Sequence, residues 1–296
     1  MPTPEADPTP PPVRITRTGL FLRLGIFFFL ELAGLQIISP ILNGWIGYFP
    51  AAALGTFLTA LIANSIVLRI YERGRMEDVG MQWTQTSARH LGMGVAAGVA
   101  AGLFVIGLPL LAGAAKLVPA TDPANQASLG RFIFVTVLLL FGVVGEELLF
   151  RGYGFQLLVA RMGPWATILP FGVLFAVAHS MNISVSTLGL VNTGLWGIVL
   201  GFAFLRSGDL WLPIGLHFGW NWILPLFGVN LSGFTMVLTG FEIRWNVGEI
   251  WSGGGYGPEG SILTTVAAVA LGSWLYRARI EPQPAFLLEQ HNREAE

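Results

Sequence analysis

The stretch 132–151, FIFVTVLLLFGVVGEELLFR, is a long apolar run that ends with three charged side chains. Further apolar runs of about 20 residues, long enough to cross the hydrocarbon core as a helix, fill most of the chain. They lie at 19–41, 46–69, 91–114, 131–158, 164–181, 187–205, 210–228 and 261–277. The sequence predicts an all-α polytopic integral membrane protein with about eight transmembrane helices and an intramembrane polar cavity.

The composition agrees with this class. Of 296 residues, 53% are hydrophobic and only 11% are charged, against roughly 25% charged residues in a soluble domain. The formal net charge of -1 gives no basic excess, so we expect no nucleic-acid partner. The absence of cysteine excludes disulfides, thiolate metal ligands and a cysteine nucleophile.

The ends of the chain differ from its apolar middle. Residues 1–17 are proline-rich and acidic, which predicts a disordered tail and argues against a signal or transit peptide. Residues 18–279 form the predicted transmembrane helical domain, and 280–296 a C-terminal polar tail. Because the chain has no cysteine and no organellar signal, we expect a bacterial plasma-membrane protein.

Basic residues are concentrated in three places: before the first span, between the second and third, and after the last. The positive-inside rule makes these regions, and hence both termini, cytoplasmic. The arginines concerned are Arg14, Arg17, Arg69, Arg73, Arg75, Arg89, Arg277 and Arg279. The long stretch 230–260 is then external. We interpret it as an interfacial loop, with a lid over a site as the alternative.

Two carboxylates and a guanidinium lie within the predicted span 131–158. Adjacent residues of a helix point about 100° apart, whereas residues four apart share a face. Glu147 is therefore expected to form a largely structural ion pair with Arg151. Glu146 has no cation on its own helix and is free to face a polar cavity, so we predict that it is a general base.

Imidazole and amide groups follow in later spans. His179 lies four residues after Phe175, and His217 lies four residues before Asn221, so each pair shares a helix face. Polar side chains inside a bilayer are costly and are by default a functional hypothesis. A hydrogen-bond network between helices is the alternative. In the third span, Gly94, Gly98 and Gly102 recur at every fourth position and predict close packing against another helix.

Several protease chemistries lack their motifs. The chain has neither a His-Glu-x-x-His zinc signature nor a Gly-x-Ser-x-Gly nucleophile elbow. Its only aspartates are Asp7, Asp78, Asp122 and Asp209, which do not form a pair in the middle of two spans. These absences disfavour serine, aspartyl and His-Glu-x-x-His metalloprotease mechanisms.

The ordered triple Glu-Glu-x-x-x-Arg, Phe-x-x-x-His and His-x-x-x-Asn resembles the CPBP family of intramembrane proteases, which includes the type II CAAX prenyl endopeptidase. The resemblance covers about 130–228. It implies cleavage of a peptide bond in a membrane-associated protein or peptide. It further implies that Glu146 and His179 activate water, that His217 and Asn221 stabilise the oxyanion, and that the pair Glu147 and Arg151 supports the first motif.

The cofactor and the activity itself stay open at this point. Glu146, His179 and His217 could form a zinc site with an open position for water, but we favour a metal-free mechanism in which the glutamate activates water. A different class of function is a non-proteolytic transporter, immunity or scaffold protein that uses the same polar residues for folding or binding. The sequence does not predict the substrate or the oligomeric state.

Overall fold

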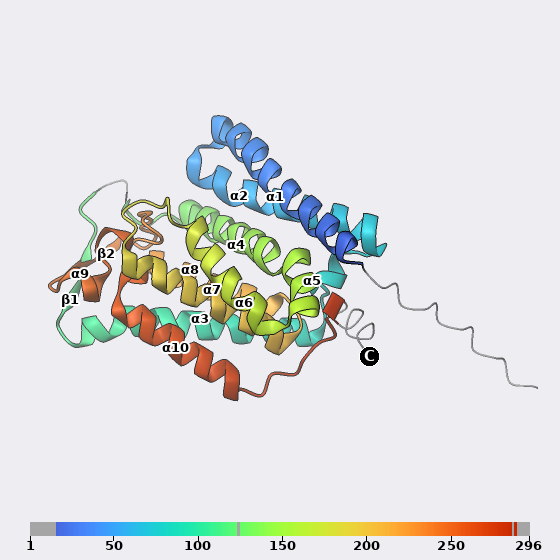
Figure 1. Ribbon diagram of the computed structural model, residues 1–296. Coiled ribbons are helices and arrows are strands. Elements are labelled where there is room, and N and C mark those ends of the chain that lie inside the picture. Colours follow the sequence, from blue (N-terminus) through green and yellow to red (C-terminus); the bar gives the residue numbers. More distant parts are fainter. Residues whose placement is uncertain (1–15, 123–124, 286, 289–296) are drawn as a thin grey trace, which may run out of the picture.

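The computed structural model describes residues 16–122, 125–285 and 287–288 and shows long helices packed side by side (Figure 1). The helices are α1 (Arg17–Ile46), α2 (Tyr48–Val67), α3 (Gln85–Leu111), α4 (Leu129–Arg151), α5 (Tyr153–Met162), α6 (Pro164–Ala178), α7 (Thr187–Ser207), α8 (Trp211–Leu226), the short α9 (Glu249–Ser252) and α10 (Ile262–Arg277). The strands β1 (Ala115–Pro119) and β2 (Phe241–Trp245) pair antiparallel, with Leu117 opposite Ile243. The helical fold class predicted from the sequence is confirmed.

Each predicted span contains a helix, although the helices differ in length. Five are long and apolar enough to cross a membrane, judged by length and composition: Arg17–Ile46, Tyr48–Glu72, Gln85–Leu111, Leu129–Met162 and Thr187–Ser207. The apolar helices α6 and α10 are shorter, and α8 has 16 residues. Of the predicted tail 1–17, residues 1–15 lie outside the described residues. Thr16 is the N-cap of α1, which begins at Arg17, and its hydroxyl accepts a hydrogen bond from the Gly19 amide.

The predicted span 131–158 is interrupted at Gly152, between α4 and α5. The Asn64 side chain of α2 donates to the carbonyl of Leu148 and accepts from the amide of Tyr153, at 3.2 and 2.8 Å. A Cβ atom on Gly152 would lie 2.4 Å from the Asn64 Oδ1 atom, so a larger residue does not fit. Asn64 therefore satisfies the Tyr153 amide, which the break in the helix releases, while the Leu148 carbonyl also keeps its bond from the Gly152 amide.

The glycine row predicted as a packing surface joins α3 to α8. Cβ atoms on Gly94 and Gly98 would lie 2.4 and 2.1 Å from the carbonyl oxygens of Leu212 and Leu216. The contact is reciprocal, because Gly215 of α8 approaches the carbonyl of Leu91 equally closely. Only glycine allows the two backbones to approach so closely, so the prediction of a packing surface is confirmed.

The C-terminal segment packs against the helices over its described part. Ile280, Ala285 and Leu287 are buried. The backbone amide of Gln283 donates to the carbonyl of Ser207 at 2.7 Å. The stretch predicted as a polar tail therefore contains, over the described residues 280–285 and 287–288, buried apolar side chains that pack against the helices.

Candidate active site

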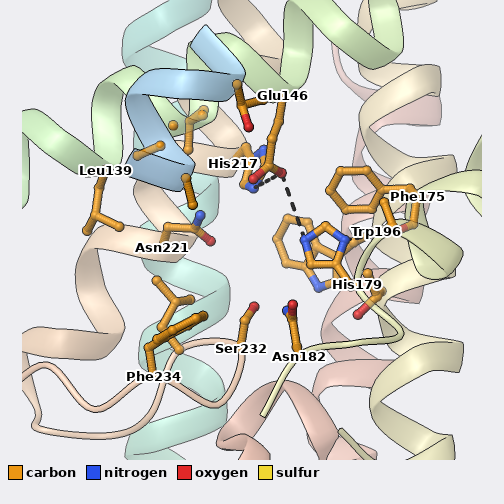
Figure 2. A pocket seen from close by; sticks show the side chains of 18 of the residues that line it. Leu139, Glu146, Phe175, His179, Asn182, Trp196, His217, Asn221, Ser232 and Phe234 are labelled. Atoms are coloured by element: carbon orange, nitrogen blue, oxygen red, sulfur yellow. Dashed lines mark hydrogen bonds and ion pairs between the residues drawn. The ribbon is translucent and has the colours of Figure 1, made fainter. Parts of the chain in front are cut away.

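A cavity of about 310 Å³ lies among α2, α4, α6, α7 and α8, and the connection between α8 and α10 closes one side (Figure 2). The four predicted catalytic residues, Glu146, His179, His217 and Asn221, all line it. Other lining side chains are mostly apolar or aromatic and include Phe49, Leu139, Phe175, Trp196 and Phe234. The cavity therefore combines an apolar wall with a few convergent polar groups, as ligand sites commonly do.

The two adjacent glutamates of α4 point to different surroundings. Glu147 is fully buried, and the Nη1 atom of Arg151 lies 3.2 Å from its Oε1 atom, so the predicted ion pair is confirmed. Arg151 also donates to the carbonyl of Gly197. The side chain of Glu146 keeps 30% of its exposure and faces the cavity. The helical rotation between neighbouring residues thus separates a paired carboxylate from one that is accessible.

His179 follows the last residue of α6. Its Nδ1 atom lies 2.8 Å from the carbonyl oxygen of Phe175. Because a carbonyl can only accept, Nδ1 carries the proton. This leaves Nε2 facing Glu146, with 3.9 Å between Nε2 and the Oε2 atom. The residue spacing that suggested a shared face therefore fixes the orientation of the imidazole through the backbone of Phe175.

His217 of α8 is oriented in a similar way. Its Nδ1 atom lies 2.8 Å from Oε1 of Glu147, the oxygen that also receives Arg151. Its Nε2 atom lies 3.8 Å from Oε2 of Glu146. Asn221 lies one turn further along α8, and Figure 2 shows its amide beside the same cavity.

One carboxylate oxygen is the meeting point of this arrangement. The Nε2 atoms of His179 and His217 both face Oε2 of Glu146, at 3.9 and 3.8 Å. This oxygen is buried and has no hydrogen-bond partner among the described residues. The structure therefore brings together three side chains that are separated by up to 71 residues in the sequence, and it leaves a basic oxygen uncommitted.

The connection 227–261 forms part of the cavity wall. Leu231, Ser232, Phe234 and Glu259 line the cavity. The ring of Phe234 packs against those of Tyr48 and Phe49 of α2, with centroids 6.0 and 5.4 Å apart. The interpretation of 230–260 as an interfacial loop did not predict that it lines the cavity. The alternative of a lid over the site agrees with this position.

Glu259 is a polar lining residue that sequence reasoning missed. Its Oε2 atom accepts hydrogen bonds from the backbone amide and the hydroxyl of Ser232, and its Oε1 atom accepts from Nε1 of Trp220 at 3.4 Å. Burial raises the pKa of the Glu259 carboxyl, and the bonds from Ser232 oppose this shift. Burial, followed by the charge of Glu259, raises the pKa of Tyr256 to about 12. The only sequence signal was an acidic residue in a glycine-rich loop.

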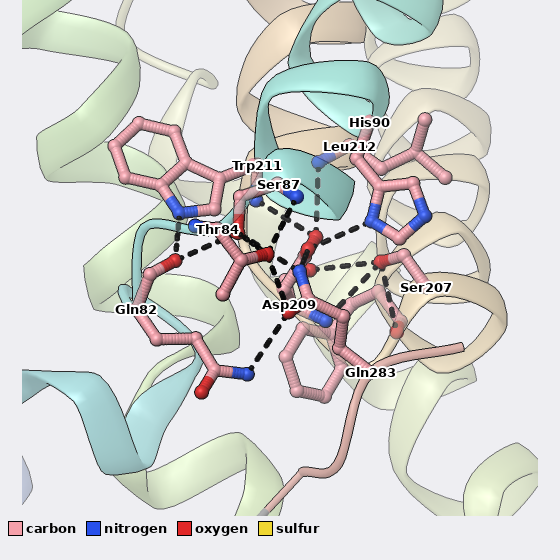
Figure 3. Close-up of polar contacts among 10 residues, drawn as sticks. Gln82, Thr84, Ser87, His90, Ser207, Asp209, Trp211, Leu212 and Gln283 are labelled. Atoms are coloured by element: carbon pink, nitrogen blue, oxygen red, sulfur yellow. Dashed lines mark hydrogen bonds and ion pairs between the residues drawn. The ribbon is translucent and has the colours of Figure 1, made fainter. Parts of the chain in front are cut away.

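A second buried histidine and carboxylate lie away from the cavity, where α3, α7 and α8 meet the C-terminal segment (Figure 3). The Nδ1 atom of His90 lies 2.7 Å from Oδ2 of Asp209, and both side chains are buried. Oδ2 of Asp209 also accepts from the side chain of Gln283, and Oδ1 accepts from the amides of Trp211 and Leu212 at the start of α8. Both carboxylate oxygens are therefore committed.

The alternative of a zinc site at Glu146, His179 and His217 makes a geometric demand on these side chains. Among the described residues, no group of three or more His, Asp and Glu side chains is placed so that it could hold a metal ion. The Nε2 atoms of His179 and His217 lie 3.9 and 3.8 Å from Oε2 of Glu146, farther than the separation of about 3.4 Å between ligand atoms that bonds of about 2.1 Å to a tetrahedral zinc imply. The donor set in this arrangement does not fit a metal centre, and the mechanism below includes no step on a metal.

Comparison with known proteins agrees with the motif triple. A family model described as type II CAAX prenyl endopeptidase Rce1-like matches residues 128–223, which confirms the resemblance predicted from the sequence. The chain is also 27% identical over 181 residues to an uncharacterized 24.3 kDa protein of Escherichia coli. That alignment covers 59% of this chain and 78% of the relative.

The matched segment extends from the start of α4 into α8 and contains the four predicted catalytic residues. Together with the long apolar helices, the family match identifies an integral membrane protein. At the level of the family, it supports an endopeptidase that acts on a protein or peptide in a membrane. Glu259 lies outside the matched segment.

Proposed function

We propose that this protein is an intramembrane endopeptidase in which Glu146 and His179 activate the attacking water. The observation that carries the proposal is the convergence of two imidazole Nε2 atoms on one Glu146 oxygen that has no hydrogen-bond partner in the described part of the chain. Separations of 3.8 and 3.9 Å are too long for direct hydrogen bonds and suit polar atoms that share a water molecule.

The reaction follows from the donors and acceptors. Glu146 removes a proton from water while His179 accepts a hydrogen bond at Nε2, and the oxygen attacks the carbonyl carbon of the scissile peptide bond. The carbonyl oxygen gains the negative charge. When the C–N bond breaks, the proton held by Glu146 passes to the leaving nitrogen, which restores the carboxylate and releases an acid and an amine.

His217 and Asn221 are the proposed oxyanion donors. The Asn221 amide can donate directly. Because Nδ1–H of His217 is committed to Glu147, donation from Nε2 requires the doubly protonated ring, which in this position lies between the carboxylates of Glu146 and Glu147. Removing one such donor typically lowers kcat by about 10²-fold or more, so we expect this loss for Asn221→Ala.

The test is cleavage in liposomes. Wild type, Glu146→Ala and His179→Ala are reconstituted with a bacterial membrane-protein extract, and new N-termini are identified by mass spectrometry. Wild type is expected to generate them, whereas both variants do not. Glu249→Ala, a change of an exposed glutamate outside the cavity, is the control and cleaves normally. Undiminished cleavage by both site variants contradicts the assignment.

Metal dependence is tested separately. We expect purified protein without stoichiometric zinc to remain active, and activity to survive chelation. Tightly bound stoichiometric zinc whose removal abolishes cleavage would overturn the metal-free mechanism. Incubation of Glu146→Gln with the same extract, followed by crosslinking and mass spectrometry, is expected to retain uncleaved substrate and identify it.

We further propose eight crossings in a bacterial plasma membrane with both termini cytoplasmic. The basic segment between α2 and α3 supports this orientation. Because the chain has no cysteine, single cysteines at exposed positions report the topology. In spheroplasts, whose plasma membrane is intact, a membrane-impermeant maleimide is expected to label Glu249→Cys but not Glu77→Cys. The reverse pattern contradicts the orientation.

A further inference from the structure

The carboxylate of Glu259 lies across the cavity from Glu146. Figure 2 shows Ser232 at the opposite end of the cavity from Glu146, and Oε2 of Glu259 is bonded to the amide and hydroxyl of Ser232. The indole of Trp220 donates to the other oxygen. Three neutral donors therefore hold the Glu259 side chain in one orientation.

The charge of Glu259 is not matched by a permanent cation. Among the described residues, no lysine or arginine lines the cavity, and none forms an ion pair with Glu259. His179 is the cavity base close enough to act on its charge, and Tyr256 is the neighbouring titratable acid. This differs from Glu147, which the guanidinium of Arg151 compensates. Without a permanent counter-charge the charged form of this carboxylate is costly, which is why burial raises its pKa, and a bound cation would stabilise the charged form.

The rest of the wall indicates the kind of ligand. Tyr48, Phe49, Trp196 and Phe234 give the cavity an aromatic surface, while Glu146 and Glu259 place negative charge at its two ends. Such a wall fits an apolar segment that carries one positive group. The distance across the cavity keeps that group apart from the reacting carbonyl.

We propose that Glu259 binds a cationic group of the substrate, an ammonium or guanidinium, at the end of the cavity opposite Glu146. That the ligand is a peptide rests on the function proposed above. The cation is either a lysine or arginine side chain or a free N-terminal amine, which share this chemistry. Glu259 thereby selects apolar peptides with one positive charge over uncharged or acidic ones.

The experiment measures binding without cleavage. Full-length protein carrying Glu146→Gln is placed in phosphatidylcholine nanodiscs, whose lipids have no net charge. Four fluorescein-labelled, leucine-rich peptides are compared by anisotropy. Three are acetylated and carry lysine, norleucine or glutamate at one central position, and the fourth carries norleucine and a free N-terminus. Norleucine matches the lysine stem without its charge.

The lysine or the free-amine peptide is expected to bind about 10-fold more tightly than the acetylated norleucine peptide. Whichever gains identifies the source of the cation. Adding Glu259→Gln should reduce this preference to less than about twofold, whereas adding Glu249→Gln, the exposed control, should leave it intact.

Equal binding of all four peptides, no binding of any, or a cation preference that survives Glu259→Gln would overturn the proposal. The comparison of peptides on the parent protein does not depend on whether Glu259→Gln folds. If cationic peptides bind selectively and the wild-type protein never cleaves them or any membrane protein, the proposed protease function fails while this assignment stands.

Discussion

Two buried clusters in this protein pair a histidine with a carboxylate, and they differ in how the carboxylate oxygens are hydrogen-bonded. His217 with Glu147 and His90 with Asp209 have nearly the same Nδ1–O distances, 2.8 and 2.7 Å. In the cluster of Figure 3, donors bind both oxygens of Asp209. In the cluster of Figure 2, Glu146 is the residue next to Glu147. Its Oε2 atom has no hydrogen bond among the described residues, and its side chain lines the cavity.

This difference shows which observation distinguishes a structural cluster from a candidate catalytic one. The presence of a buried carboxylate beside a histidine does not, because both clusters contain one. For these two clusters the hydrogen bonding does: the fully bonded Asp209 specifies packing, whereas the unsatisfied Glu146 oxygen that faces the cavity is available to a reacting molecule. Substitutions in each of the two clusters test this distinction.

Glu146→Gln is expected to have the largest effect on function. Loss of the general base should lower the rate of cleavage by about 10²- to 10⁴-fold. Its effect on unfolding should be small, because Oε2 has no hydrogen bond to lose. Cleavage in liposomes and denaturant unfolding of the same preparation measure both quantities. A large loss of stability with normal cleavage would place Glu146 with the structural cluster.

Asp209→Ala should show the reverse pattern. The change leaves the buried His90 side chain, the half-buried Gln283 side chain and the first amides of α8 without their acceptor. Breaking a buried pair of this kind costs about 3–5 kcal/mol of unfolding free energy. Turnover per folded molecule, measured at a temperature where the variant is folded, should change far less. A stable variant with abolished turnover would contradict the division.

Glu147→Gln tests the residue that links packing to chemistry. The change leaves the buried guanidinium of Arg151 without its carboxylate and should cost about 3 kcal/mol of stability. It also removes the charge that orients His217, so kcat should fall while KM stays close to wild type. If stability falls and kcat is unchanged, Glu147 is structural alone.

Gln283→Ala should have the smallest effect. Its side chain bonds Ser87 and Asp209, and the loss of these contacts is expected to cost about 1–3 kcal/mol. The cavity is distant from this contact, so cleavage should not change. Thermal unfolding detects the shift. A variant with unaltered stability would show that the C-terminal segment contributes nothing to the second cluster.

Much of the fold was accessible from the sequence because the apolar runs are long and the motif spacings are helical. The pair Glu147 and Arg151 follows from a four-residue spacing, and the contact of Gly94 and Gly98 with another helix follows from small residues on one face. The break at Gly152 was missed because it depends on Asn64, which is distant in the sequence.

The site was predictable only in part for the same reason. Helix periodicity identifies which side chains share a face, but not which helices meet. The approach of His179 and His217 to one oxygen of Glu146 is a tertiary feature. Glu259 could not be found, because it belongs to no motif and its role depends on Ser232 and Trp220, 27 and 39 residues away.

Because the glycines of α3 and α8 are in close contact, a substitution outside the cavity can change the geometry of the site. A methyl group on Gly98 would lie 2.1 Å from the carbonyl of Leu216, directly before His217, so α8 would have to shift along or away from α3. A misplacement of about 1 Å can lower an enzyme's rate about 10²-fold. These glycines act as a mechanical stop that sets the position of the His217 imidazole. Mutational intolerance should therefore extend along this backbone contact to residues that never meet a substrate.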